Sequence, residues 1–145
     1  MNDEPTRQLI LFQLNKKPFG IDATTVQEIL PQTAVRQVPR LAEHIEGIFS
    51  FRGRIIPLIN LGVLLSLTDE TYIGNIIVIS QRGQLMGLIV DKVLAVLTDH
   101  DQFEKIKLDK SITNTYVQDF VAYKELKVAV LDLAKIATTI AAGEE

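Results

Sequence analysis

The chain has 145 residues, a formal net charge of −3 at pH 7 and no cysteine. This length fits one domain or two small lobes around a shared core. The lack of cysteine excludes thiol chemistry and disulfides. The chain is acidic overall and has no basic stripe of the kind that most nucleic-acid binders carry. No apolar run is long enough to span a bilayer, so we expect no direct membrane insertion. Together with the charge balance, this leaves proteins or small molecules as the expected partners and no nucleic acid.

Most of the chain is predicted to form short β-strands, because its apolar runs are rich in β-branched residues and end at turns. Gly83 lies in one of these turns, where a glycine supplies positive φ. Short strands separated by turns are typical of small barrels or sandwiches. The predicted runs cover residues 8–14, 54–61, 76–79, 85–97, 116–123 and 126–131.

Two helices are predicted in addition to the strands. The first covers residues 22–30, with Asp22 as its N-cap and Pro31 directly after its end. The second is a C-terminal helix that begins after Asp132 and carries an apolar stripe. In the first helix, the apolar face consists of Val26, Ile29 and Leu30.

Two short segments of the chain resemble each other. Residues 57–64 and residues 129–136 each contain an apolar strand end, a capping side chain (Asn60 and Asp132) and the start of a helical turn. This similarity suggests two related lobes whose sheets end alike. Chance similarity over so short a stretch is the alternative.

The sequence contains no signature of catalysis. It lacks the G-x-S-x-G nucleophile elbow, the phosphate-binding loop and the G-x-G-x-x-G fingerprint, and its two histidines, His44 and His100, lie in different segments. Asp99-His100-Asp101 is compatible with a metal site, an acid–base pair or a polar loop. We favour the loop because no fourth ligand or adjacent nucleophile can be named, and we predict that the protein is not an enzyme and has no catalytic residue, metal or cofactor.

Arg52-Gly53-Arg54 lies between two apolar runs, and Gly53 is expected at a turn or bulge. If the segment is extended, Arg52 and Arg54 project on the same side. They are then either solvated edge charges that discourage aggregation or guanidinium groups presented to a partner's carboxylate or carbonyl. The residues by themselves leave both interpretations open.

The segment at residues 51–61 resembles the N-L-R-G-x-[IV]-[IV]-P-[IV]-[IV]-D-L signature of CheW-like domains. Asn60 stands in place of the signature aspartate, and the two residue types are nearly equal as N-caps. Phe51 stands in place of the smaller leucine, a difference that concerns which partner the protein binds. The resemblance implies one CheW-like domain over residues 8–140, made of two small five-stranded β-barrel lobes, with tails at residues 1–7 and 141–145. Further matches, in the same order and spacing, are residues 19–22, 26–29, 45–48 and 87–93.

What the resemblance implies is a cytoplasmic, non-catalytic adaptor or scaffold. Such a protein couples the cytoplasmic tip of methyl-accepting chemoreceptors to the regulatory domain of a CheA-type histidine kinase, in arrays on the inner face of the membrane. The acidic start of the chain has no features of an export signal, which agrees with this location. The chain carries no receiver or kinase sequence, so we expect a stand-alone adaptor rather than a CheV-type fusion.

In this family the receptor tip is expected in the groove between the lobes, and the output is flagellar chemotaxis or type IV pilus (twitching) control. The alternative is a small β-barrel nucleic-acid-binding protein, which the acidic balance and the lack of interleaved aromatic and basic residues disfavour. The residues that match receptor- or partner-contact positions are Arg52, Glu28, Val26, Phe51, Gly47, Val93 and Val96.

Overall fold

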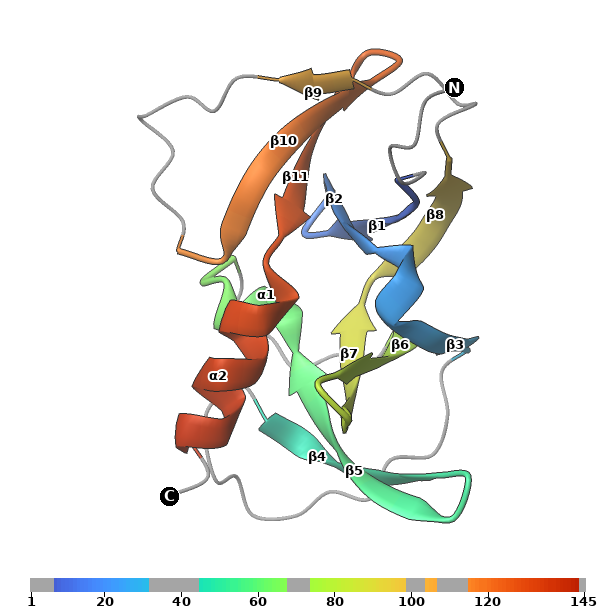
Figure 1. The fold of residues 1–145 in the computed structure, drawn as a ribbon, viewed down its shortest axis with the longest axis vertical. Coiled ribbons are helices and arrows are strands. Elements are labelled where there is room, and N and C mark those ends of the chain that lie inside the picture. Colours follow the sequence, from blue (N-terminus) through green and yellow to red (C-terminus); the bar gives the residue numbers. More distant parts are fainter. Residues whose placement is uncertain (1–6, 32–44, 68–73, 99–103, 107–114, 144–145) are drawn as a thin grey trace, which may run out of the picture.

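The computed structural model describes residues 7–31, 45–67, 74–98, 104–106 and 115–143, and within these ranges most residues lie in two β-sheets (Figure 1). The predicted mainly β fold is confirmed, although one sheet has six strands instead of the expected five. That sheet has the order β8 (Lys92–Leu97), β1 (Leu9–Leu14), β2 (Lys17–Asp22), β11 (Leu126–Leu131), β10 (Val117–Tyr123), β9 (Glu104–Ile106). The five-stranded sheet has the order β3 (Val26–Leu30), β6 (Asn75–Gln81), β7 (Gln84–Val90), β5 (Arg54–Asn60), β4 (Ile45–Phe51).

The region predicted as the first helix forms a short 3-10 helix, η1 (Ala23–Thr25), followed by strand β3. The prediction of a helix over residues 22–30 is therefore wrong, although Asp22 does cap η1 by accepting a hydrogen bond from the backbone N–H of Thr24. The β-branched residues Val26 and Ile29 favour the extended backbone of β3. β3 pairs antiparallel with β6 and so joins the five-stranded sheet.

A β-bulge explains why the spacing of apolar residues in β3 resembled that of a helix. Gln27 is an extra residue, because its neighbours Val26 and Glu28 pair with consecutive residues of β6. The bulge puts Val26 and Ile29 on the same face of the sheet although they are three residues apart, and it leaves Leu30 on the opposite face. Residues three apart also lie on one face of a helix, so the spacing of the apolar residues could not distinguish a helix from a bulged strand.

Two α-helices follow the strands that pair in parallel with β7 and β2. α1 (Leu61–Leu64) follows β5, and α2 (Leu133–Gly143) follows β11, so the predicted C-terminal helix is confirmed. Asn60 accepts a hydrogen bond from the N–H of Val63, and Asp132 accepts one from the N–H of Lys135, both at 3.2 Å. The two capping side chains therefore have the same role, as the sequence similarity suggested.

The similarity between the two lobes extends over nearly all of their strands. In β4–β5 a one-residue register shift follows the pair Ile45–Ile59, and in β10–β11 a shift of the same kind follows the pair Val117–Leu131. β5 then pairs in parallel with β7, as β11 does with β2. The strand orders β3-β6-β7-β5-β4 and β8-β1-β2-β11-β10 correspond one to one, with β9 added to the second. The lobes are structural repeats of each other.

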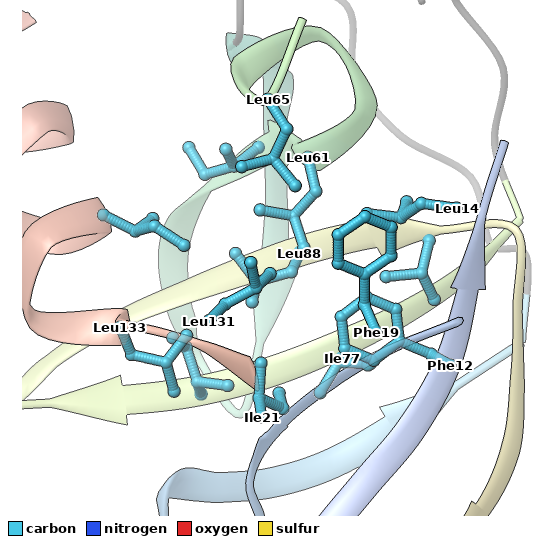
Figure 2. Packing of buried hydrophobic residues seen from close by; sticks show 14 of the residues in the cluster. Phe12, Leu14, Phe19, Ile21, Leu61, Leu65, Ile77, Leu88, Leu131 and Leu133 are labelled. Carbon is cyan, nitrogen blue, oxygen red and sulfur yellow. The ribbon is translucent and has the colours of Figure 1, made fainter. Parts of the chain in front are cut away.

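A single apolar cluster contains side chains from both sheets (Figure 2). Phe12 and Phe19 come from the six-stranded sheet, Ile77 and Leu88 come from the five-stranded sheet, and α2 adds Ile136. Each sheet also has a smaller cluster of its own. Because separating the lobes would expose the shared cluster to water, the hydrophobic effect holds the two sheets in one arrangement.

Gly87 in β7 and Gly20 in β2 occupy equivalent positions in the two lobes. A Cβ atom at position 87 would lie 2.6 Å from Cε1 of Phe49, whereas the nearest atom to a Cβ at position 20 would be Cγ1 of Val128, at 3.3 Å. The Phe49 ring is buried. The five-stranded lobe therefore depends on its glycine more strictly than the six-stranded lobe does.

We expect Gly87→Ala to lower the free energy of unfolding by about 1–3 kcal/mol, because the buried Phe49 ring has to shift. Gly20→Ala is the matched control and should cost clearly less. Urea unfolding followed by far-UV circular dichroism measures both values. Equal losses in the two variants would contradict this account.

Asn60 is fully buried and makes two hydrogen bonds that depend on its amide. Its Oδ1 accepts from the N–H of Val63, and its Nδ2 donates to Oε1 of Glu46 at 3.1 Å. An aspartate would keep the cap but would place a second carboxylate beside Glu46. The equivalent positions in the other lobe hold Asp132 and Gln118, so each lobe combines one carboxylate with one amide.

Asn60→Asp should therefore lower the free energy of unfolding, by about 1–3 kcal/mol for a buried group that loses its hydrogen bond. Adding Glu46→Gln copies the arrangement of the other lobe and should restore most of this loss. Urea unfolding at pH 7 of the two variants and the native chain provides the comparison. The explanation fails if the double variant is no more stable than Asn60→Asp alone.

Candidate functional site

The β4–β5 hairpin turns at Arg52-Gly53, whose φ angles are 50° and 79°. Positive φ at both central residues is the requirement of a two-residue type I′ turn, so the expected turn at Gly53 is present. β4 ends at Phe51 and β5 begins at Arg54, which pair across the hairpin. The prediction that Arg52 and Arg54 project on the same side of an extended segment is wrong, because Arg52 belongs to the turn.

The Arg52 side chain is fixed by one ion pair and one aromatic contact. Its Nη2 donates to Oε1 of Glu28 at 3.1 Å, and its Cζ lies 4.9 Å from the centre of the Phe51 ring, a cation–π distance. The Arg52 side chain is 63% exposed and that of Glu28 is 40% exposed. We call Arg52, Glu28 and Phe51 the Arg52 corner.

The Arg52 corner connects the two edges of the five-stranded sheet. Glu28 lies in β3, which is the first strand of that sheet, and Arg52 directly follows β4, which is the last. The ion pair therefore connects the two edge strands of the sheet through their side chains. A guanidinium has five N–H donors, and the Glu28 contact uses Nη2. An exposed planar donor group with a fixed orientation is suited to a carboxylate or carbonyl of another protein.

Val93 and Val96 lie in β8, the edge strand of the other sheet, and a bulge again determines which way they face. Leu94 is the extra residue, so Val93 pairs with Phe12 and Val96 pairs with Ile10. Phe12 and Ile10 belong to the shared cluster, and residues directly opposite each other in a sheet share a face. Val93 packs against the shared cluster, whereas Val96 is 54% exposed.

β3 presents the same arrangement from the five-stranded sheet. Val26 packs against the shared cluster, and Ile29, on the same face, is 37% exposed. Sequence reasoning placed Val26 at a partner contact but did not single out Ile29. A signal was present, because the sequence Val-Gln-Glu-Ile-Leu of residues 26–30 matches Val-Leu-Ala-Val-Leu of residues 93–97 at its apolar positions.

Phe51 and Gly47 are buried, so they differ from the other predicted contact residues. The Phe51 ring belongs to the small cluster of the five-stranded sheet, and the Arg52 guanidinium lies over its face. Gly47 lies toward the other end of β4, next to the register shift, and pairs with Leu58. The structure therefore brings together Arg52, Glu28 and Phe51 but does not place Gly47 beside them.

Ile55 is a further exposed side chain that the sequence did not single out. It is 66% exposed, directly beyond the Arg52 turn, and it pairs with Ser50. Ile48 and Pro57 pair with each other on the same face of the hairpin and are half-buried. This face gives the hairpin an apolar surface beside the charged turn.

Chemistry that requires a metal finds no support in the described ranges. No group of three or more His, Asp or Glu side chains there is placed to hold a metal ion. Asp99, His100 and Asp101, like His44, lie outside the described residues. No helix in the described part of the chain is long and apolar enough to cross a membrane.

Comparison with known proteins gives a consistent result. The model of the CheW-like domain family matches residues 8–141. "Chemotaxis protein CheW" of Treponema pallidum is 31% identical over 144 residues, covering 94% of this chain and 84% of the relative, and that of Bacillus subtilis is 34% identical over 99 residues, covering 65% and 62%. The crystal structure of the scaffolding protein TtCheW from Thermoanaerobacter tengcongensis superposes with a TM-score of 0.74 and 26% identity, covering 92% of this chain and 89% of that one.

The Arg52–Glu28 ion pair is exposed, so its removal should hardly affect stability. We expect Arg52→Ala and Glu28→Ala each to change the free energy of unfolding by less than about 1 kcal/mol. Arg54→Ala is the matched control, because Arg54 is exposed in the same hairpin and forms no ion pair with any described residue. Urea unfolding measures all three variants, and a cooperative loss of fold in Arg52→Ala alone would make the arginine structural.

Proposed function

This chain belongs to the CheW-like domain family, and we propose that it is a non-catalytic adaptor that couples chemoreceptors to a CheA-type histidine kinase. The family match spans residues 8–141, and relatives that match over most of the chain are chemotaxis and scaffolding proteins. The alternative of a nucleic-acid-binding barrel is not favoured, because the net charge is −3.

The observation that carries this proposal is the exposed guanidinium of Arg52, which lies on the segment that matches the family signature. Glu28 and the Phe51 ring hold the side chain in one orientation before any partner arrives. Because less rotamer freedom is then lost on binding, such a preorganised group gains affinity. The proposed ligand of Arg52 is a carboxylate or backbone carbonyl at the cytoplasmic tip of a chemoreceptor.

Apolar contacts with the receptor tip would come from the two edge strands. Ile29 in β3 and Val96 in β8 are exposed, and each lies beside a valine, Val26 or Val93, that packs on the shared cluster. A receptor helix placed between the lobes would bury these side chains, which stabilises the complex through the hydrophobic effect. Gly47 lies away from this surface, and its proposed role in partner binding is therefore indirect.

The second proposed partner is the regulatory domain of the kinase. An adaptor of this kind acts by holding two proteins in a defined relative position, and the shared apolar cluster makes its two lobes one rigid connection. Individual contacts can be weak, because an array of receptors and kinases multiplies them through effective concentration. The proposed location is therefore the cytoplasm, at receptor arrays on the inner face of the membrane, with either flagella or pili as the output.

Binding measurements with purified partners test this function. The native chain should bind a receptor cytoplasmic fragment and a CheA-type regulatory domain, and Arg52→Ala should weaken receptor binding about tenfold, as loss of a charged interface contact does. Glu28→Ala should weaken it less, because the guanidinium is still present but no longer held. Isothermal titration calorimetry gives the affinities.

Arg54→Ala is the control for this experiment, since it removes an exposed arginine from the same hairpin. It should bind the receptor fragment as the native chain does. The adaptor function is wrong if the native chain binds neither partner at high concentration. The assignment of Arg52 alone is wrong if Arg52→Ala and Arg54→Ala behave alike.

A further inference from the structure

The strands pass from one sheet to the other at two places. The chain leaves the six-stranded sheet after β2 and enters the five-stranded sheet at β3, with η1 between them, and it returns from β7 to β8 through the single residue Asp91 (Figure 1). The two crossings are equivalent in the repeat, because β2 corresponds to β7 and β3 to β8. The contacts made at these crossings therefore bear directly on how the two lobes are oriented.

The crossing at Asp91 is held by hydrogen bonds that connect the two lobes. Oδ2 of Asp91 accepts from the backbone N–H of Asn15, in the β1–β2 turn of the six-stranded lobe, at 2.9 Å. Nδ2 of Asn15 donates to the carbonyl oxygen of Leu67, which follows α1 in the five-stranded lobe, at 3.0 Å. The N–H of Val93 in β8 donates to Oδ1 of Asn75 in β6, also at 3.0 Å. We call Asp91, Asn15 and Asn75 the inter-lobe clasp.

The backbone beside the inter-lobe clasp is closely packed. A Cβ atom at position 74 would overlap the carbonyl oxygen of Val90 and would lie 2.5 Å from that of Asp91, so Gly74 lies directly against the crossing. The backbone N–H of Asp91 donates to the carbonyl oxygen of Gln13 in β1 at 3.0 Å. The crossing is therefore enclosed by both lobes, with β1 from the six-stranded lobe and Gly74 from the five-stranded lobe.

The other crossing is held by local hydrogen bonds. Asp22 accepts from the backbone N–H and the hydroxyl of Thr24, and its carbonyl oxygen accepts from the hydroxyl of Thr25. Thr24 is the equivalent of Asp91, because each lies four residues after the matched glycine of β2 or β7. Among the described residues, no side-chain hydrogen bond at this crossing joins the two lobes. The inter-lobe clasp thus has no counterpart in the repeat.

We propose that Asp91, Asn15 and Asn75 are positioning residues, which set the orientation of the lobes and thereby the coupling between receptor and kinase. The shared cluster keeps the lobes together, but the hydrophobic effect is non-directional, and packed faces can slide past each other by small amounts. Hydrogen bonds require defined distances and angles, so the clasp selects one orientation. This inference rests on the proposed function, because its two partners are the receptor tip and the kinase regulatory domain.

The Asp91 carboxylate is better suited to fixing an orientation than to adding stability. Its Oδ1 is buried and has no hydrogen-bond partner among the described residues, and a buried acceptor left unpaired costs about 1–3 kcal/mol. A buried polar group with little net effect on stability still contributes by specifying one arrangement. Val93, which Asn75 holds, lies in the strand that carries the exposed Val96. The clasp therefore determines where that strand lies relative to the Arg52 corner.

The test compares variants that break the inter-lobe clasp with matched controls. Asn15→Gly removes the hydrogen bond to Leu67 and keeps the turn, because glycine readily adopts the φ of 49° found there. Its control is Arg82→Gly, since Arg82 is exposed and holds the same place in the β6–β7 turn, with φ of 54°. Asp91→Ala removes the carboxylate, whereas Asp91→Asn keeps an oxygen that can accept the N–H of Asn15.

Three measurements are made on each variant. The chain has no cysteine, so cysteines introduced at the exposed Arg54 and Glu125, one in each lobe, carry two spin labels, and double electron–electron resonance gives the distance distribution between them. The second measurement is the activity of a CheA-type kinase with the receptor cytoplasmic fragment and the unlabelled variant. The third is the affinity for each partner separately, by isothermal titration calorimetry.

We expect Asn15→Gly and Asp91→Ala each to broaden the distance distribution and to lower receptor-dependent kinase activity about three- to tenfold, as mutations that act on coupling do. Each separate affinity should stay within about twofold, because the variants leave the Arg52 corner unchanged. Arg82→Gly and Asp91→Asn should resemble the native chain in all three measurements. Urea unfolding confirms that each variant is folded, and if Asp91→Ala does not fold, Asn15→Gly and its control carry the comparison.

Several outcomes would overturn the positioning role. Native-like distance distributions in Asn15→Gly and Asp91→Ala would do so, as would unchanged kinase activity in variants whose distributions are broadened. Equal effects of Asn15→Gly and Arg82→Gly would also overturn it, because the turn rather than the hydrogen bond would then be responsible. Each of these results leaves the adaptor function intact as long as the native chain binds both partners. Failure of the native chain to bind either partner would overturn both proposals.

Discussion

The two sheets bury one face each in the same apolar cluster, and the rest of the molecule is arranged around that burial. Because both edge strands must turn two side chains, three residues apart, toward this cluster, each carries a bulge at the same position. The bulges leave Ile29 and Val96 at the rim, where the cluster meets solvent. The same constraint therefore produces the rigidity of the two lobes and the exposed apolar side chains beside their junction.

The lobes keep the same backbone but differ in their polar side chains, and the differences fall into two kinds. At the ends of the strands that precede the helices, Glu46 with Asn60 in one lobe corresponds to Gln118 with Asp132 in the other, so each lobe has one carboxylate and one amide. In the five-stranded lobe Asn60 is buried, so an aspartate in its place would lose the hydrogen bond that the amide donates to Glu46. At the surface, where water solvates an unpaired charge, the ion pair of one lobe is absent from the other.

This difference gives the two hairpin turns distinct chemistry on one framework. Arg52 is neutralised and held by Glu28, and its remaining donors are presented in a fixed direction. Lys124, at the equivalent turn of the other lobe, forms no ion pair with any described residue.

The sequence by itself determined the mainly β class, the turns at Gly53 and Gly83 and both capped helix starts, because turn residues, caps and apolar runs act over a few neighbouring residues. Only the tertiary structure decided three further points. Residues 26–30 form a strand, since a bulge reproduces the spacing of a helix face and pairing with β6 resolves the ambiguity. Arg52 pairs with Glu28, and the two lobes repeat each other, because both facts depend on contacts between residues far apart in the chain, which local pattern does not encode.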